Sequence, residues 1–379
     1  MKETKAIVVN WTLFFFLILA ALLQGWTTLT KTSRGKIEKG ETPQTVLSLY
    51  TSPNNPRNGE GDFITLKDGR ILFIYTHFTD SGSGNGDFGG AYLASRYSTN
   101  GGKTWSKKDQ IVLKVANVAN IMSVSLLRLQ DGNIALFYLK KYSKTDCIPV
   151  MRISKDEART WGPPKPCITD RKGYFTVNNN RVIQLTNGRL LIPVSLFNLL
   201  SPGSIWHKAG SIFTYYSDDN GATWHHSKEI PNPDHVGTQE PDIVKLKNGQ
   251  LLMFMRTDAR VQYVSYSRDQ GETWTPAQPS NIVSPISPAS IVTIPSSGDL
   301  LLVWNNNGKN EDRTPLDIAI SHDDGKTWQH EKALENSSNG SYCYTAIHFV
   351  GKYALFSYYS SEVRGGSVIK RVSIKWIYK

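Results

Sequence analysis

Short apolar segments alternate with polar turns along most of the chain, and six of them share one form. In each, two runs rich in Ile, Leu, Val, Phe and Tyr flank a tight turn, which in four cases is Asp-Gly or Asn-Gly. Such a turn between alternating apolar positions is the strongest local signal for a β-hairpin. The sequence therefore predicts six hairpins, at residues 64–75, 126–139, 182–194, 243–255, 292–304 and 347–359.

A second pattern, Ser-x-Asp-x-Gly-x-Thr-Trp, follows each of the first five hairpins. Asn100 replaces the Asp in the first copy and Ala158 replaces the Gly in the second. Asp, Asn and Gly suit tight turns, and the Trp supplies a large apolar plug. We interpret these turns as structural and assign them no chemistry. They lie at residues 98–105, 154–161, 217–224, 267–274 and 321–328.

The two patterns together form a repeat, whose five boxed copies start 50 to 63 residues apart. A period of this length is typical of a propeller or a solenoid. Two hairpins per unit make one four-stranded antiparallel blade. The sequence therefore predicts an all-β fold, a six-bladed β-propeller over residues 46–379, whose last strand at 368–377 closes the ring or completes the final blade. The boxed turns are expected on the side away from any catalytic mouth.

The boxes and their spacing resemble the Asp-box (BNR) repeats of the sialidase (neuraminidase) superfamily. That resemblance implies an exo-α-sialidase, which releases terminal sialic acids from glycans by a retaining mechanism with a Tyr nucleophile. It implies no cofactor and no metal. Neither the three Cys nor the eight His have metal-ligand spacing.

Glu240 stands just before the fourth hairpin and Arg256 just after it. Because a hairpin returns its ends to the same side, we expect these two side chains to lie close together. The resemblance implies that Glu240 is the base that activates the tyrosine and that Arg256 binds a substrate carboxylate.

Three further residues follow from the same resemblance. Tyr344, just before the last hairpin, corresponds to the nucleophile, with Tyr342 as the alternative, since strand alternation places both on one face. Arg313, ahead of the fifth box, corresponds to another carboxylate-binding arginine. Asp87, in a glycine-rich loop after the first hairpin, corresponds to the acid/base, with Asp80 as the alternative.

Arg57 is assigned as the remaining carboxylate-binding arginine of the predicted site, on its position alone. Sialidases open their first strand with Arg-Ile-Pro, which this chain lacks, and Arg57 is the arginine between the polar segment and the first hairpin. The departure also admits another acidic sugar as substrate. Arg181 and residues 287–290 occupy the equivalent positions of other units and are expected to line the same mouth.

The N-terminus differs from the rest of the chain. Lys2 and Lys5 precede an apolar run over residues 13–23, as in a signal peptide. Residues 1–26 are therefore predicted to be a signal peptide or a membrane anchor, attached through residues 7–23, and residues 27–45 a linker. Either form predicts export.

The net charge of +11 is compatible with an anionic substrate. No nucleic-acid motif and no dense Lys/Arg cluster occurs, so neither a nucleic acid nor a partner protein is predicted. A glycan-binding propeller without catalysis is the competing hypothesis, and it requires neither Glu240 nor Tyr344.

Overall fold

The computed structural model of the protein describes residues 42–79, 86–197 and 209–379. Contacts within the chain divide it into Met1–Lys39 and Gly40–Lys379, and the fold described here is that of the second unit. The predicted signal or anchor segment lies outside the described residues. Among the described helices, none is long and apolar enough to cross a membrane.

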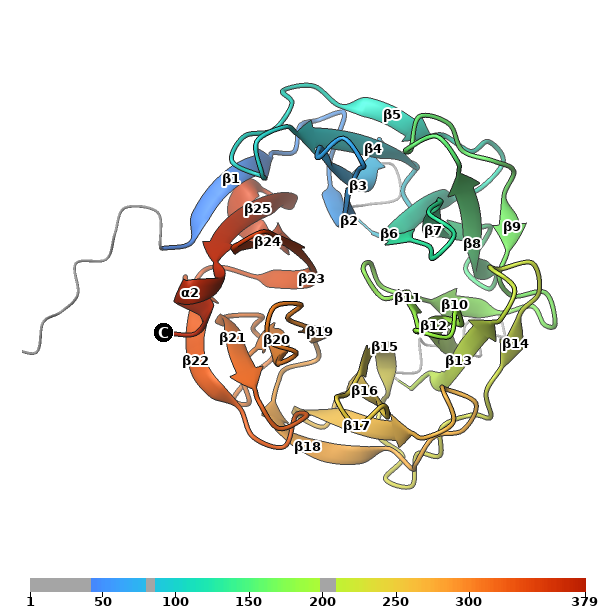
Figure 1. Ribbon diagram of the computed structural model, residues 1–379, viewed down its shortest axis with the longest axis vertical. Helices are drawn as coiled ribbons and strands as arrows, with labels where there is room; N and C mark the ends of the chain where they lie inside the picture. The colour runs from blue at the N-terminus through green and yellow to red at the C-terminus, as the bar shows by residue number, and fades with distance from the viewer. Residues whose placement is uncertain (1–41, 80–85, 198–208) are drawn as a thin grey trace, which may run out of the picture. The chain divides into compact units, whose positions relative to one another are not determined.

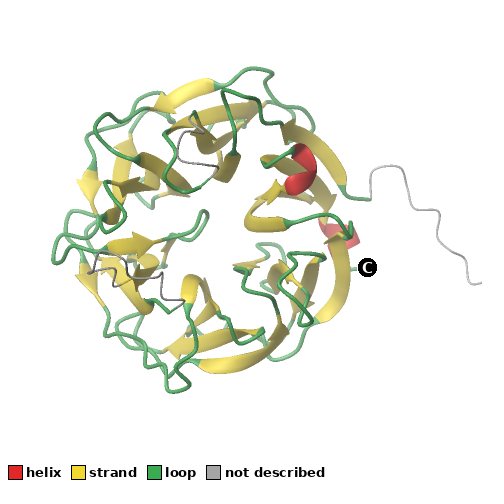
Figure 2. Ribbon diagram, turned by 180° about the vertical axis from the view of Figure 1, so that it is seen from behind, coloured by secondary structure: helices red, strands yellow, loops and turns green. Residues whose placement is uncertain are grey.

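Antiparallel sheets follow one another around a ring (Figure 1). Figure 2 shows the same ring from behind, with strands joined by loops and very little helix. Three of the sheets consist of four strands in chain order. They are β2 (Asn58–Thr65), β3 (Ile71–Phe78), β4 (Ala91–Ser98) and β5 (Gln110–Leu113); β15 (Gln239–Lys245), β16 (Leu251–Arg256), β17 (Val261–Ser267) and β18 (Gln278–Val283); and β19 (Ser290–Thr293), β20 (Leu300–Asn305), β21 (Leu316–Ser321) and β22 (Gln329–Glu335).

A nine-stranded sheet holds two hairpin-and-box units, joined by a parallel pair between Tyr174 and Cys147. Its strands are β6 (Asn120–Arg128), β7 (Ile134–Lys141), β8 (Cys147–Ser154), β9 (Lys165–Pro166), β10 (Tyr174–Thr176), β11 (Ile183–Gln184), β12 (Leu190–Phe197), β13 (Ser211–Ser217) and β14 (His225–His226). The all-β propeller class is confirmed. The number of six blades stays a prediction, because it depends on dividing this sheet at that pair.

The two ends of the described chain meet in the last sheet. β1 (Gln44–Leu49) pairs with β25 (Gly366–Ser373), which pairs in turn with β24 (Tyr353–Ser360) and β23 (Tyr342–Val350). The N-terminal strand thus forms the outer edge of the C-terminal sheet and closes the ring. It begins at Gln44, two residues before the predicted start of the propeller.

The predicted final strand is too long at its C-terminal end. β25 stops at Ser373, and Ile374–Ile377 forms the short helix α2. The Ser373 side chain accepts a hydrogen bond from the Trp376 amide at 3.1 Å and so caps that helix. The alternating apolar positions over residues 368–377 predicted a continuous strand and gave no sign of this helix cap. A second helical turn within the described residues, η1 (Ser361–Val363), connects β24 to β25.

The boxed turns were expected on the side away from the mouth, and they lie beside the ends of the inner strands that are opposite to Arg57 and Glu60. In every unit the first Ser of the box pairs with the first residue of the preceding strand, for example Ser98 with Ile71 and Ser321 with Leu300. In the fifth box, Ser321 Oγ accepts the Gly325 amide and Asp323 accepts both the amide and the hydroxyl of Thr327. Ala158 adopts the left-handed φ of 62° that Gly takes elsewhere. The boxes are therefore turns that their own side chains stabilise by hydrogen bonds, which is a structural role.

Neighbouring sheets bury their apolar faces against each other. One such cluster joins Ile64 and Ile74 of the β2–β5 sheet to Ile121, Val124 and Leu136 of the next sheet. This packing holds the inner strands at fixed positions around the ring centre. The residues at the mouth-side ends of those strands are therefore held on rigid elements.

Candidate active site

Four inner strands, β2, β6, β15 and β23, share one irregularity near the mouth of the ring. In each, the pairing register shifts within a short bulge. One residue in each bulge has a left-handed backbone, with φ of 53° at Glu60, 59° at Ser123, 42° at Glu240 and 59° at Tyr344. Such a conformation costs a non-glycine residue about 1–3 kcal/mol and is frequent at functional sites, where a bulge re-aims a side chain.

Arg57 stands between two carboxylates. Its Nη1 lies 2.6 Å from Asp87 Oδ1 and its Nη2 lies 2.7 Å from Glu60 Oε1. The predicted acid/base and the first predicted arginine are therefore in contact. Burial raises the pKa of the Asp87 carboxyl, but the charges of Arg57 and Lys141 outweigh it and hold that pKa below its usual value.

Glu60 is almost fully buried, with 5 % of its side chain exposed. Ser123 donates a hydrogen bond to its second carboxylate oxygen. Burial raises the pKa of Glu60 against the opposing charge of Arg57. Glu60 was not predicted from the sequence, although the sequence carries a signal for it. Glu60-Gly61-Asp62-Phe63 repeats the form of Glu240-Pro241-Asp242-Ile243 at the start of an inner strand.

Glu240 and Arg256 are paired as the hairpin argument predicts. Glu240 Oε2 lies 2.5 Å from Arg256 Nη1, and both side chains are largely buried. The Glu240 amide is held by Ser195 Oγ at 2.8 Å. The pair is therefore fixed by the sheet and differs from an exposed salt bridge at a strand end.

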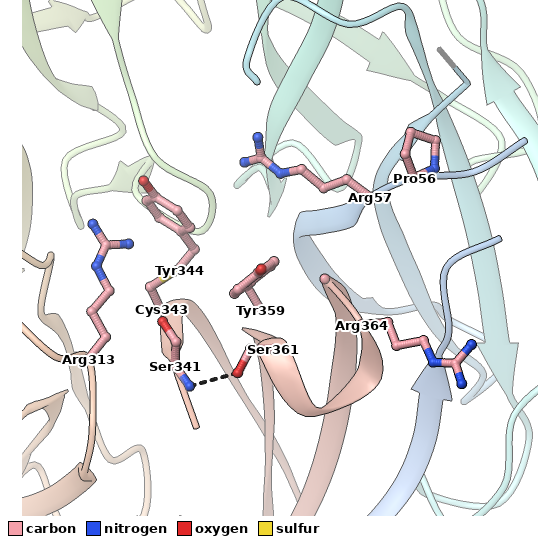
Figure 3. Close-up of a pocket in the computed structure, with 10 residues that line it drawn as sticks. Pro56, Arg57, Arg313, Ser341, Cys343, Tyr344, Tyr359, Ser361 and Arg364 are labelled. Carbon is pink, nitrogen blue, oxygen red and sulfur yellow. Dashed lines mark hydrogen bonds between the residues drawn. The ribbon is translucent and has the colours of Figure 1, made fainter. Parts of the chain in front are cut away.

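Tyr344 and Arg313 are neighbours in the lining of a cavity of about 560 Å³. The Arg313 guanidinium lies 5.8 Å from the centre of the Tyr344 ring, and its Nη2 donates to the Ile286 carbonyl at 3.1 Å. Within the described residues it forms no ion pair with a carboxylate. Figure 3 shows the guanidinium groups of Arg57 and Arg313 reaching toward the Tyr344 ring from opposite sides. A group placed between them would meet two cations and a phenol.

The surroundings of Tyr344 favour the protonated form of its phenol. Burial raises its pKa, the Glu240 carboxylate raises it further, and the charges of Arg313 and Arg256 oppose that shift without cancelling it. A nucleophile in this state needs a base to take its proton during attack, and the neighbouring carboxylate is Glu240.

The structure distinguishes the alternatives by position. Tyr342 is fully buried in the core beside Tyr358, at a ring separation of 6.0 Å, so it lies away from the cavity. The bulge between Cys343 and Ala346 breaks the strand alternation that places Tyr342 and Tyr344 on one face. Asp80 lies outside the described residues.

Arg181 does not line the mouth, and that expectation was wrong. It is 1 % exposed and forms an ion pair of 2.7 Å with Asp242. It also donates to Ser290 Oγ and to the Ala289 carbonyl, so it ties the inner strands together. Ser290 is buried in the same network and is a structural residue as well. Among the described residues, no three His, Cys, Asp or Glu side chains are grouped as metal ligands.

This geometry is that of a propeller with an arginine-rich cavity beside a partly buried tyrosine, and the comparison of sequences identifies its class. Residues 93–353, more than half of the chain, match the BNR repeat-like domain. The chain belongs to that family, within the sialidase superfamily that its boxes resemble.

Individual relatives are more distant. A sialidase of Micromonospora viridifaciens is 25 % identical over 335 residues, which cover 79 % of this chain and 48 % of the relative. A sialidase of Bacteroides fragilis is 24 % identical over 225 residues, which cover 56 % of this chain and 39 % of the relative. The chain thus spans less than half the length of these two curated relatives.

Solved structures share the fold at lower identity. A protein of unknown function from Dyadobacter fermentans superposes with a TM-score of 0.70 at 19 % identity, covering 87 % of this chain and 98 % of its own. The NanB sialidase of Streptococcus pneumoniae superposes with a TM-score of 0.69 at 14 % identity, covering 88 % and 71 %. At these identities the likeness concerns the propeller fold alone.

Proposed function

We propose that the protein is an exo-α-sialidase that hydrolyses terminal sialic acids with retention of configuration. The observation that carries the proposal is the placement of Tyr344 beside Arg313 and within electrostatic range of the Glu240–Arg256 pair. A sialic acid carries a carboxylate on its anomeric carbon. A neutral phenol next to arginines can attack that carbon without the repulsion that a carboxylate nucleophile would meet.

In the first step, Tyr344 Oη bonds to the anomeric carbon while its proton passes to Glu240. The glycosidic oxygen leaves with the proton of Asp87. In the second step, Asp87 takes a proton from water, the water oxygen bonds to the anomeric carbon, and the Tyr344 oxygen leaves with the proton held by Glu240. Atoms and charges balance over the two steps.

The arginines differ in their availability. Arg313 has no carboxylate partner among the described residues, and Arg256 has one, so we assign the substrate carboxylate chiefly to these two. Arg57 lines the cavity but is engaged by both Glu60 and Asp87. In this proposal Arg57 binds substrate only in competition with those carboxylates and also orients Asp87.

Asp87 must be protonated to act as the acid, yet its ion pair with Arg57 favours the charged form. Substrate binding therefore has to exchange that contact for one with the glycosidic oxygen. The rate should fall as the pH rises above the acidic range, because the protonated fraction of Asp87 decreases.

The test is hydrolysis of a fluorogenic α-sialoside by the purified protein, with proton NMR of the first released sugar to read its anomeric configuration. Release of the α-anomer supports the proposal. Absence of hydrolysis together with binding of free sialic acid identifies the non-catalytic glycan-binding propeller.

The ion pairs of Arg57 with both Glu60 and Asp87 favour one other function, a glycosidase for a different acidic sugar. A parallel assay with an aryl glucuronide distinguishes this function from that of a sialidase.

We also propose that the protein is exported from the cytosol. The positively charged start and the apolar run over residues 13–23 support a signal peptide or an anchor. Fractionation of cells that express the full chain tests it, and recovery of the protein in the cytosol would contradict it.

A further inference from the structure

Lys141, the last residue of β7, is buried to an extent that is rare for a lysine. It is 1 % exposed, and within the described residues it forms no ion pair with a carboxylate. Burial lowers its pKa, which the more distant charges of Asp87 and Glu60 only partly offset. A lysine held this way costs free energy, and such groups are concentrated at functional sites.

The Lys141 ammonium contacts the loop that carries Asp87, and it also lies 3.5 Å from Met122 Sδ. Its Nζ donates to the backbone carbonyl of Asp87 at 2.6 Å. The ammonium also lies 4.6 Å from the ring centre of Phe88 and 5.5 Å from that of Tyr174. These ring contacts supply the attraction that a carboxylate would otherwise give.

Asn120, the first residue of β6, holds the same loop from the neighbouring strand. Its Nδ2 donates to the Asp87 carbonyl at 2.6 Å and to the Gly89 carbonyl at 3.1 Å. Asn120 and Lys141 are direct partners in the β6–β7 register. One pair of facing residues therefore grips the loop at two carbonyls.

These hydrogen bonds hold the backbone of the loop and do not involve the carboxyl group of Asp87. The Asp87 side chain is about half exposed, and within the described residues its ion pair is with Arg57. The loop itself is rich in glycine, with Gly86, Gly89 and Gly90 around the acid, so its own backbone does little to fix its position. An acid that must leave Arg57 for a substrate oxygen needs its main chain held during the exchange.

We propose that Lys141 and Asn120 are positioning residues that hold the Asp87 loop where the carboxyl can protonate the leaving oxygen. This rests on the sialidase activity proposed above. Both act through the Asp87 backbone, and neither touches the reacting atoms.

Leaving groups of different basicity provide the test. Departure of a sugar alcohol requires an acid, whereas 4-nitrophenolate departs without one. General acid catalysis contributes about 10²–10⁴-fold to rate. For full-chain Lys141→Met, we expect kcat/KM for an α-sialyl-lactose to fall on the order of 10²-fold and that for 4-nitrophenyl α-sialoside to fall less than about 5-fold. Lys140→Met changes a neighbouring lysine that contacts the Tyr142 ring, and it should leave both rates unchanged.

Asn120→Ala provides a second, independent variant with the same expected selectivity. Equal losses on both substrates, or no loss, in the folded variants would overturn the proposal. So would failure of both variants to fold, as judged by thermal melting, because the two residues would then be structural supports. If the unmodified protein cleaves neither sialoside, the proposed activity itself fails, which is a separate outcome.

Discussion

Glu240 and Arg256 stand at the two ends of one hairpin and meet at 2.5 Å in the structure. The Glu240 carboxylate also raises the pKa of Tyr344, so the two groups share one electrostatic environment. The same carboxylate therefore forms an ion pair with Arg256 and disfavours the charged form of the Tyr344 phenol. In the proposed mechanism, Arg256 would hold Glu240 in place while this carboxylate accepts the phenol proton.

Tyr344 and Glu240 are expected to act as one unit. Glu240→Gln cannot accept the phenol proton and Tyr344→Phe removes the attacking oxygen, so each should lower kcat by several orders of magnitude. Groups that act together give non-additive losses, and the double variant should be little slower than either single one. The measurement is kcat on one sialoside for all three variants. Multiplied losses in the double variant would show that the two residues act independently.

The nucleophile is predicted to be Tyr344 and not Tyr342. Tyr344→Phe keeps the ring but removes the oxygen at the cavity, so turnover should be lost while a sialic acid analogue still binds. Tyr342→Phe removes a buried hydroxyl from the core, and it should change stability more than rate. Calorimetric binding and kcat for the two variants provide the comparison. A dead Tyr342→Phe and an active Tyr344→Phe would reverse the assignment.

Glu60 is predicted to control the charge that a substrate meets at Arg57. Glu60→Gln keeps an oxygen for the Ser123 hydroxyl but cannot pair with the guanidinium, so the site gains one positive charge. We expect KM for an anionic sialoside to fall several-fold. Glu362→Gln, at an exposed acid of η1, controls for the change in net charge. An unchanged KM in Glu60→Gln would mean that Arg57 does not reach the substrate.

Trp224 of the third box is predicted to affect stability and not activity. It is partly buried and packs edge-on against Phe137 at a ring separation of 6.4 Å, at the border of the core cluster of the nine-stranded sheet. Trp224→Ala should lower the free energy of unfolding by about 2–4 kcal/mol, the loss expected for truncating a large core side chain. Urea denaturation measures the loss and kcat checks the site. Normal stability with lost turnover would contradict the structural role of the boxes.

Stability should fall in mild acid because of His348. Burial lowers the pKa of His348 to about 4, and its ring stacks on Phe63 while Nε2 contacts Thr65 Oγ1. Between about pH 6.5 and 4 the unfolded chain binds a proton that the folded chain does not, so this contribution is present above pH 6.5 and lost as the pH falls.

The size is at most about 1.4 kcal/mol per pKa unit. Urea denaturation of His348→Gln across that range should show a smaller pH slope than the unmodified protein. The exposed His225→Gln should keep the slope, and an equal slope in all three proteins would exclude His348 as the cause.

Local chemistry determined much of this protein in advance. Turn dipeptides and apolar alternation predicted the hairpins, and the boxes predicted the propeller class, because both features are encoded within a dozen residues. The pairing of Glu240 with Arg256 was also predictable, since one hairpin sets the distance between its own ends.

Contacts between strands far apart in the chain decided the rest. The bulge at Tyr344 interrupted the simple alternation of β23, so Tyr342 lies in the core and Tyr344 lines the cavity. Arg181 became an internal tie because Asp242, from the next unit, came within 2.7 Å. A buried charge is stable only when an opposite charge lies close to it. The distance between two such side chains from different units depends on how the strands pack in the ring, and a local sequence pattern does not contain that distance.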